Sequence, residues 1–469
     1  MGFRTCRRNG RRVIERMRNE GPRIVIVNAY WSVHSSVAYI VRALESAGFA
    51  VDVFLYRADE KLSQGLLKNT SRVRIHRYEQ PGADSTAKDN VVLRNTGPNF
   101  REAVLALLPK RLRSALRRIR HRLLLHFAPA KVLVPEDLVR QIIEICKAPQ
   151  TVALIGVEKG GLVTAGVVAE RNGIPLVYYS LELYTRTHKA MEWPYMKELK
   201  RLEEKYHRKC ALTIVQDEHR GKALLASNGV HRTTQLAYFP VSLSGSPNAR
   251  PSRWLQDVLK LSPEDVVLLS CGMISQNRHE LDLVRIAQKF PAEWRLVFHG
   301  YGNDASIQAV KANDTAKRVC VSTDLVPVSE LESVVRSAKI GLAIYGATCD
   351  NDRFTGLSSE KIAMYVKCGI PLIAFRYPSY EHIETEGAGV LVQSVDDIQQ
   401  AARIILSNYR SYSEGAYRCF QKYYCFERNF ENVLRNLETF PSWNEAGRDA
   451  LVLASRLDGA NPINDDARG

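Results

Sequence analysis

The chain has 469 residues, of which 45% are hydrophobic and 25% charged, a composition that excludes disordered, collagen-like and disulfide-scaffold proteins. This length exceeds what one hydrophobic core usually organises, so we expect two domains. The net charge of +16 comes mostly from segment 1–23, with eight Arg and two Glu, and segment 110–122, with seven Lys or Arg and no acid. Two separate cationic segments differ from the groove of basic and aromatic side chains that binds nucleic acid, so we expect no nucleic-acid partner.

The cysteines and the N-terminus indicate the compartment. Nine cysteines, an odd number without Cys-x-x-Cys pairs or zinc-type spacing, predict reduced thiols. No apolar stretch follows the arginines of segment 1–23, and no apolar run reaches the ~20 residues that span a bilayer. We therefore expect a cytoplasmic protein.

Strands and helices are predicted to alternate along the first half of the chain. The run RIVIVNAY, which starts at Arg23, is continuously apolar and rich in β-branched residues, as expected of a buried strand. Alternation of strands and helices predicts a parallel sheet covered on both faces. The predicted strands are 23–30, 51–56, 152–156, 175–179 and 212–216, and the predicted helices are 37–47, 162–171 and 218–227.

A second series of the same kind follows a Ser-, Pro- and Gly-rich stretch, which predicts a linker at 241–255. The fold class we predict is α/β, with two Rossmann-like doubly wound domains that face each other across a ligand cleft. The strands of the second series are predicted at 265–270, 294–299, 318–322, 340–345 and 371–375. The predicted boundaries are 1–240 for the first domain, 256–410 for the second, 411–440 for helices returning to the first, and 441–469 for a disordered tail.

The segment SSEKIAMYVKCGIPLIAF, at 358–375, carries the most information about a ligand. A helix that begins at Ser358 and Ser359 presents unpaired N–H groups and the positive end of its dipole beside Lys361, which suits a diphosphate. The alternative is that Ser358 only caps the helix and Lys361 is only a solvated charge.

Two further turns follow predicted strands of the second domain. Gly272 offers close backbone approach, and Arg278 follows six residues later at the opening of the next helix. The run HGYGND supplies Gly300 and Gly302, placed for the nucleoside side of a ligand. Together these turns predict a phosphate site at one sheet edge.

The order of these motifs resembles the donor-binding half of GT-B glycosyltransferases, of the group 1 or family 4-like type found in bacterial envelope and exopolysaccharide synthesis. The resemblance covers about 22–437 and implies two GT-B domains. Retaining members carry a Glu where this chain has Met364, so the stereochemical outcome stays open. The resemblance implies contacts of Gly272, Arg278, Ser358, Ser359 and Lys361 with the donor diphosphate, of Leu325 and Val326 with the base, and of Glu360 with a ribose or sugar hydroxyl.

Candidate bases lie in the first half of the chain. His34 follows the first strand, and Glu158 and Glu182 follow later strands, so all three are expected to face the cleft. An inverting enzyme needs one such group to deprotonate the acceptor hydroxyl, whereas a retaining enzyme needs none. The alternatives are a backbone-bonded loop histidine and carboxylates that pair with cations or cap helices.

A basic amphipathic helix is predicted within a long insertion near 103–127. Leucines and an isoleucine follow helical spacing between residues 110 and 125, and arginines fill the other face. Such a helix lies in the headgroup layer of an anionic membrane, so we predict peripheral contact with the inner membrane face and a lipid-linked acceptor. The alternative is an ordinary packed surface helix.

The sequence thus predicts transfer of a sugar from a nucleotide-diphosphate sugar to a hydroxyl of a lipid-linked or glycan acceptor. Cations and a helix dipole would stabilise the departing diphosphate, so neither a metal nor another cofactor is required. The alternatives are a nucleotide-sugar epimerase built on the same two halves and a non-catalytic anion- or nucleic-acid-binding protein.

Overall fold

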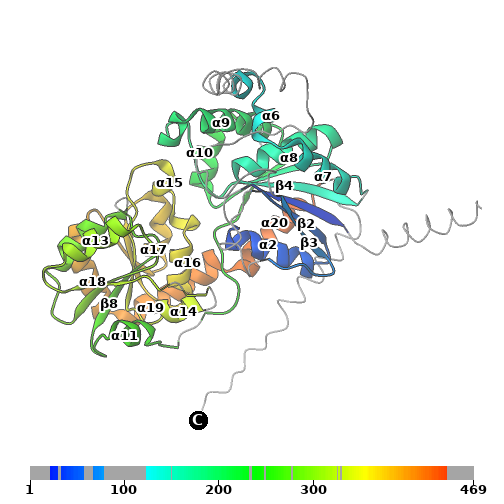
Figure 1. The fold of residues 1–469 in the computed structure, drawn as a ribbon. Helices are drawn as coiled ribbons and strands as arrows, with labels where there is room; N and C mark the ends of the chain where they lie inside the picture. Colours follow the sequence, from blue (N-terminus) through cyan, green and yellow to red (C-terminus); the bar gives the residue numbers. More distant parts are fainter. Residues whose placement is uncertain are drawn as a thin grey trace, which may run out of the picture.

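The protein forms two α/β domains, each built on a parallel sheet with helices on both faces (Figure 1). The strand order is β3-β2-β1-β4-β5-β6-β7 in the first sheet and β10-β9-β8-β11-β12-β13 in the second. The predicted fold class is therefore confirmed. The computed structural model describes residues 22–29, 33–56, 67–78, 123–148, 150–231, 235–247, 250–275, 278–324, 326–327 and 330–440.

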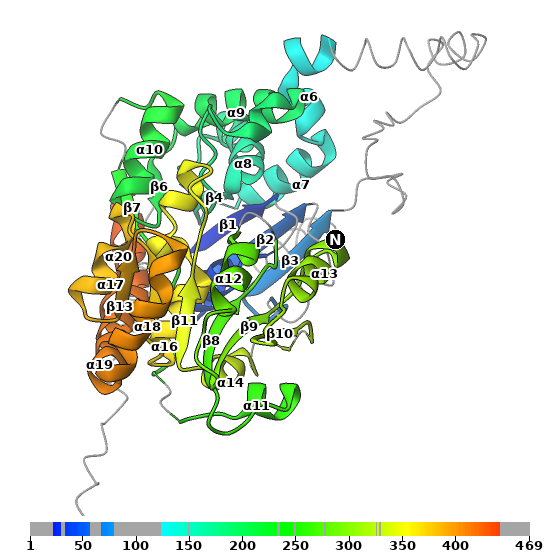
Figure 2. The same cartoon turned by 90° about the vertical axis from the view of Figure 1, so that its left-hand side faces the viewer.

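The first sheet is buried on both faces, which explains the continuous apolar runs in its sequence. Along β4, Leu154 and Ile155 point to opposite faces, and each belongs to a separate hydrophobic core. Figure 2 shows α7, α8 and α9 together over one of these faces. The strands are β1 (Arg23–Asn28), β2 (Ala50–Tyr56), β3 (Val73–Tyr78), β4 (Thr151–Val157), β5 (Leu176–Tyr179), β6 (Leu212–Val215) and β7 (Gln235–Tyr238). The helices are α2 (Ser35–Ser46), α6 (Pro129–Leu133), α7 (Glu136–Cys146), α8 (Glu158–Asn172), η1 (Lys189–Glu192), α9 (Pro194–His207) and α10 (Glu218–Asn228).

The second sheet is built the same way, with Leu268 and Leu269 of β8 in different cores. Its strands are β8 (Val266–Cys271), β9 (Trp294–His299), β10 (Val319–Ser322), β11 (Ile340–Ala343), β12 (Leu372–Phe375) and β13 (Gly389–Val392). Its helices are α11 (Trp254–Leu259), α12 (Glu280–Ala287), α13 (Asp304–Ala312), α14 (Leu331–Val335), α15 (Asp350–Arg353), η4 (Gly356–Ser358), α16 (Glu360–Lys367), η5 (Pro378–Tyr380), α17 (Glu381–Thr385), η6 (Val395–Asp397), α18 (Ile398–Ser407) and α19 (Tyr409–Cys419).

The chain crosses between the domains twice, and the two crossings pair with each other. Leu243, in the stretch before α11, accepts a hydrogen bond from the backbone of Phe426 at 3.1 Å and donates one to Tyr424 at 2.9 Å. This contact joins the predicted linker to the return of the chain from the second domain.

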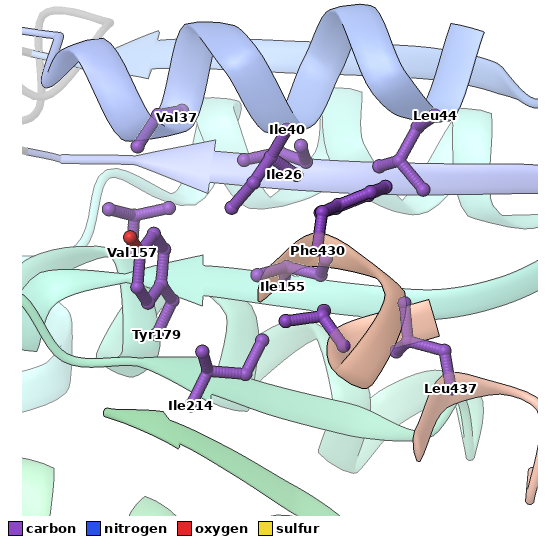
Figure 3. Close-up of a pocket in the computed structure, with 11 residues that line it drawn as sticks. Ile26, Val37, Ile40, Leu44, Ile155, Val157, Tyr179, Ile214, Phe430 and Leu437 are labelled. Atoms are coloured by element: carbon purple, nitrogen blue, oxygen red, sulfur yellow. The ribbon is translucent and has the colours of Figure 1, made fainter. Parts of the chain in front are cut away.

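The helices of 411–440 divide between the two domains. The π-helix η7 (Phe420–Tyr424) packs with α19 in a core of the second domain, whereas α20 (Phe426–Leu437) packs on the first sheet. Figure 3 shows Phe430 and Leu437 of α20 beside Ile155 and facing Leu44 of α2, around a small apolar pocket. Only α20 therefore lies on the first domain.

Several predictions fall on residues outside the described ranges. These are the basic segment 1–21, the tail 441–469 and most of the insertion near 103–127, of which the structure describes only 123–127. Among the residues that are described, no helix is long and apolar enough to cross a membrane.

Candidate functional site

Each of the two sheets has a topological switch point, where the strand order reverses. In the first sheet the switch lies between β1 and β4, and in the second between β8 and β11. Loops at the carboxyl ends of such strands form the usual ligand site of doubly wound folds. Contacts between the domains run from α2 to α16 and from α10 to the loop around α15, which extends toward α10 in Figure 1.

Two cations of the second domain converge on one aromatic ring. The Arg278 guanidinium lies 4.4 Å from the ring centroid of Tyr345, and the Lys361 ammonium lies 5.1 Å from it. Neither cation forms an ion pair with any carboxylate of the described residues. Because two like charges held together repel, the arrangement favours an anion between or beside them.

The helix α16, which contains Lys361, begins later than the sequence suggested. Ser359 is the N-cap of α16, accepting a hydrogen bond from the Ile362 N–H at 3.3 Å and sharing one with the Tyr345 hydroxyl at 2.7 Å. Ser358 lies in the preceding turn η4 and accepts a hydrogen bond from Arg220 of the first domain at 3.1 Å. Thus one serine caps the helix, and the other belongs to an interdomain contact.

The turns at Gly272 and at Gly300 and Gly302 lie side by side, and their contact with each other accounts in part for the glycines. Gly272 has φ +118°, and a side chain there would lie 3.9 Å from the Lys361 ammonium. A Cβ at Gly300 would lie 2.0 Å from the Gly272 carbonyl oxygen, and one at Gly302 would lie 2.6 Å from the Ile274 carbonyl oxygen. The turns therefore need glycine to approach each other, with or without a ligand.

Of the two residues expected to contact the base, the structure describes only one. Val326 is partly buried and packs against a core of the second domain, while Leu325 lies outside the described residues.

His34 lies at the start of α2, opposite Glu360 of the second domain. Its Nδ1 accepts a hydrogen bond from the Ser36 N–H at 3.2 Å, so the neutral ring carries its proton on Nε2. That Nε2 lies 3.9 Å from Glu360 Oε1, which also accepts a hydrogen bond from Ser35. The Nε2 of His34 therefore faces the Glu360 carboxylate of the second domain.

Glu158 is buried and fixes the loop after β5. It is 2% exposed, has φ +59°, and its Oε1 accepts hydrogen bonds from the backbone N–H groups of Leu181 and Glu182 at 2.6 and 2.7 Å. Burial raises the pKa of this carboxyl, while Lys159, 3.8 Å away, and the two N–H donors oppose the rise. This geometry makes Glu158 a support of the cleft wall.

Glu182 is half-buried at the same edge, and its carboxylate is held from the other domain. Its Oε2 accepts a hydrogen bond from Asn351 of α15 at 2.8 Å. The other oxygen, Oε1, makes no hydrogen bond to the part of the chain that the structure describes. Glu158 Oε2 also lacks a hydrogen-bond partner, but it is buried, whereas Glu182 is partly exposed and can reach a substrate hydroxyl.

Three residues of the site were not predicted from the sequence: Tyr345, Arg220 and Asn351. Tyr345 ends the predicted strand 340–345 and looked like a core residue. Arg220 follows the strand β6 by five residues and is 3% exposed, so its position after a strand was the available signal. Burial lowers its pKa, with Glu182 and Asp217 acting in the opposite direction.

No protein-family model matches the chain, and no curated protein matches it. Solved structures do share its architecture. HepE from Anabaena in complex with UDP covers 89% of this chain and 100% of its own length, with 12% identity and a TM-score of 0.61. Sucrose-phosphate synthase from Thermosynechococcus elongatus covers 94% and 100%, with 13% identity and a TM-score of 0.59.

The chain has the GT-B fold. A putative UDP-N-acetylglucosamine 2-epimerase from Listeria monocytogenes shares it too, over 89% of this chain and 96% of its own, at 12% identity and a TM-score of 0.53. Arg278, Tyr345 and Lys361 lie together in the second domain of this fold, and His34 and Glu182 of the first domain face Glu360 and Asn351 of the second.

Proposed function

We propose that the protein is a glycosyltransferase that takes a sugar from a nucleotide-diphosphate sugar bound mainly by the second domain. The observation that carries this proposal is the pair of cations on Tyr345, without carboxylate partners among the described residues and next to the N-terminus of α16. Guanidinium, ammonium and the helix dipole all stabilise negative charge, which is greatest on the departing diphosphate. HepE, with UDP in its structure, makes uracil the first base to test.

The first domain supplies the acceptor wall. Glu182 Oε1 is free of protein partners within the described ranges, so one carboxylate oxygen is open to an acceptor hydroxyl. In an inverting reaction it would take the proton of the acceptor hydroxyl, and His34 Nε2 would donate a hydrogen bond toward the donor.

The proposed acceptor is a hydroxyl of a lipid-linked molecule or glycan at the inner face of the cytoplasmic membrane. The sequence supports this through the arginines of 110–122, and the adjoining residues Leu123 and Phe127 are 52% and 76% exposed. Exposed apolar side chains next to cations favour peripheral contact with an anionic bilayer.

A thermal-shift panel of nucleoside diphosphates tests the donor site, because a ligand that binds only the folded protein raises its melting temperature. We expect UDP to stabilise the wild type, and we expect Arg278→Ala and Lys361→Ala each to weaken its Kd about 10- to 100-fold, since each removes a charged hydrogen bond of about 1.5–3 kcal/mol. Arg285→Ala, on α12 but paired with Asp396 at 2.8 Å, is the matched control and should bind UDP normally. No shift with any nucleotide would reject the proposal.

The two other functions give different results. An epimerase would invert a centre of UDP-N-acetylglucosamine without an acceptor, which NMR of the incubated nucleotide sugar detects. A non-catalytic anion-binding protein would bind polyanions through its Arg-rich segments, and a variant without 1–22 and 110–125 would lose that binding. If the transferase proposal is correct, the same variant still binds UDP.

A further inference from the structure

Asn351 connects the second domain to the proposed base on the first. Its Nδ2 donates a hydrogen bond to Glu182 Oε2 at 2.8 Å. Its Oδ1 accepts one from the Leu183 backbone N–H at 2.8 Å and one from Arg220 Nη2 at 2.9 Å. All three partners belong to the first domain, although Asn351 lies on α15 of the second.

The amide can adopt only one orientation in this network. Backbone N–H and guanidinium groups are donors without acceptor capacity, so the oxygen of Asn351 must face Leu183 and Arg220. Its NH₂ group must then face the Glu182 carboxylate. A neutral donor aimed at a carboxylate favours the ionised form and fixes the plane of the carboxyl group.

The loop that carries Glu182 is also held from within its own domain. The buried Glu158 binds two successive N–H groups, those of Leu181 and Glu182, and Asn351 binds the next one, that of Leu183. The main chain is thus fixed on both sides of Glu182, and the carboxylate has one oxygen engaged by Asn351 and one open.

We propose that Asn351 is a positioning residue, which orients the Glu182 carboxylate from the donor-binding domain. This inference rests on the proposed transferase function and deepens it, because it makes deprotonation of the acceptor depend on the domain that binds the donor. Without the side chain of Asn351, Glu182 loses the hydrogen-bond donor of its Oε2.

The positioning role of Asn351 can be distinguished from a role in holding the two domains together, because Arg220 also joins the domains through other atoms. Its Nη1 donates hydrogen bonds to the Phe354 carbonyl oxygen at 3.2 Å and to Ser358 Oγ at 3.1 Å. Those contacts remain when the side chain of Asn351 changes, so its substitution would not by itself separate the domains.

The experiment measures hydrolysis of UDP-glucose, with water as acceptor, from pH 4.5 to 9 in the wild type, Asn351→Asp, Asn351→Ala and Arg353→Ala. Asn351→Asp places a second carboxylate beside Glu182, which raises the pKa of Glu182, so the acidic limb of the kcat profile should move up by at least one pH unit. Asn351→Ala should lower kcat about 10- to 100-fold with KM changed less than about threefold. Arg353→Ala, on the same helix and exposed, should match the wild type.

The outcomes are distinguishable. Profiles of Asn351→Asp and Asn351→Ala that coincide with the wild type, with turnover intact, would overturn the positioning role and leave the proposed function standing. Loss of UDP-induced thermal stabilisation in the Asn351 variants would assign the residue to donor binding and overturn the inference as well. A wild type that turns over neither UDP-glucose, UDP-galactose nor UDP-N-acetylglucosamine would reject the proposed function itself, and the inference with it.

Discussion

The helices α8 and α16 begin near corresponding places in the two domains, yet their surroundings differ. Each follows the strand just beyond the switch point of its sheet, β4 in the first domain and β11 in the second. At the start of α8 the protein supplies its own buried carboxylate, Glu158, which binds the N–H groups of the neighbouring loop. At the start of α16 it places two cations, Arg278 and Lys361, that have no carboxylate among the described residues.

The N-terminus of α8 therefore stabilises the fold, whereas the N-terminus of α16 is arranged to bind an anion, although the two helices occupy similar places in the two domains. Glu158 holds a left-handed backbone conformation that costs about 1–3 kcal/mol, and the bonds that it makes compensate for this strain. Arg278 and Lys361 have no such internal bonds to lose. Substitutions should therefore reduce stability at the first place and ligand affinity at the second.

The largest effect is expected from Glu158→Ala. The change leaves the Leu181 and Glu182 N–H groups and the buried Lys159 ammonium without their partner, so the free energy of unfolding should fall by about 3–5 kcal/mol. Urea unfolding followed by circular dichroism measures it. Glu218→Ala, an exposed carboxylate paired with Lys222, is the control and should leave the midpoint unchanged. Equal stability of the two variants would contradict the stabilising role of Glu158 at the start of α8.

An intermediate effect is expected from Gly300→Ala, on the side of α16. The new Cβ would meet the Gly272 carbonyl oxygen, and φ is +149°, so the free energy of unfolding should fall on the order of 3 kcal/mol. Gly173→Ala, at φ +67° with open space around it, should cost about 1–2 kcal/mol. If Gly300→Ala kept full stability and lost UDP binding, this turn would serve the ligand alone and the packing explanation would be wrong.

The smallest effect is the pH dependence that Glu158 contributes at the start of α8. Burial raises the folded-state pKa of Glu158 above its ordinary value near 4.5, so the folded state holds this proton longer than the unfolded state does. Wild-type stability should therefore fall relative to Glu158→Gln as pH rises from about 4.5 to the folded-state pKa, by less than about 1.4 kcal/mol per pH unit. Chemical unfolding of both proteins at several pH values tests this, and a wild-type stability that rose relative to that of Glu158→Gln with increasing pH would contradict it.

The buried strands could be predicted from the sequence because both of their faces are apolar. The strand predicted at 294–299 is β9, and 51–56 lies within β2. The strands β3, β7 and β13 were missed, since β3 and β7 are edge strands with exposed polar positions and β13 is only four residues long. In β3, Arg74, His76 and Arg77 interrupt the apolar run that marks the buried strands.

The site was predictable where a residue type and a turn coincide. Arg278 and Lys361 were predicted as diphosphate ligands because cations beside glycine turns and a helix N-terminus indicate phosphate, and the structure brings both cations to the Tyr345 ring. Tyr345 was missed because an aromatic residue at a strand end is usually core, and Asn351 was missed because its three partners lie more than 130 residues away along the chain. Single-sequence patterns contain no signal for such distant pairing.

The return of α20 to the first sheet has a consequence for biosynthesis. Phe426, Phe430 and Leu434 complete a core whose strands are made some 200 or more residues earlier. A nascent chain therefore carries one face of its first sheet without α20 until the whole second domain has emerged from the ribosome, although N-terminal domains commonly fold first. The domain that begins the chain is the last one to be finished, and premature termination anywhere before residue 426 would release it with an uncovered apolar face.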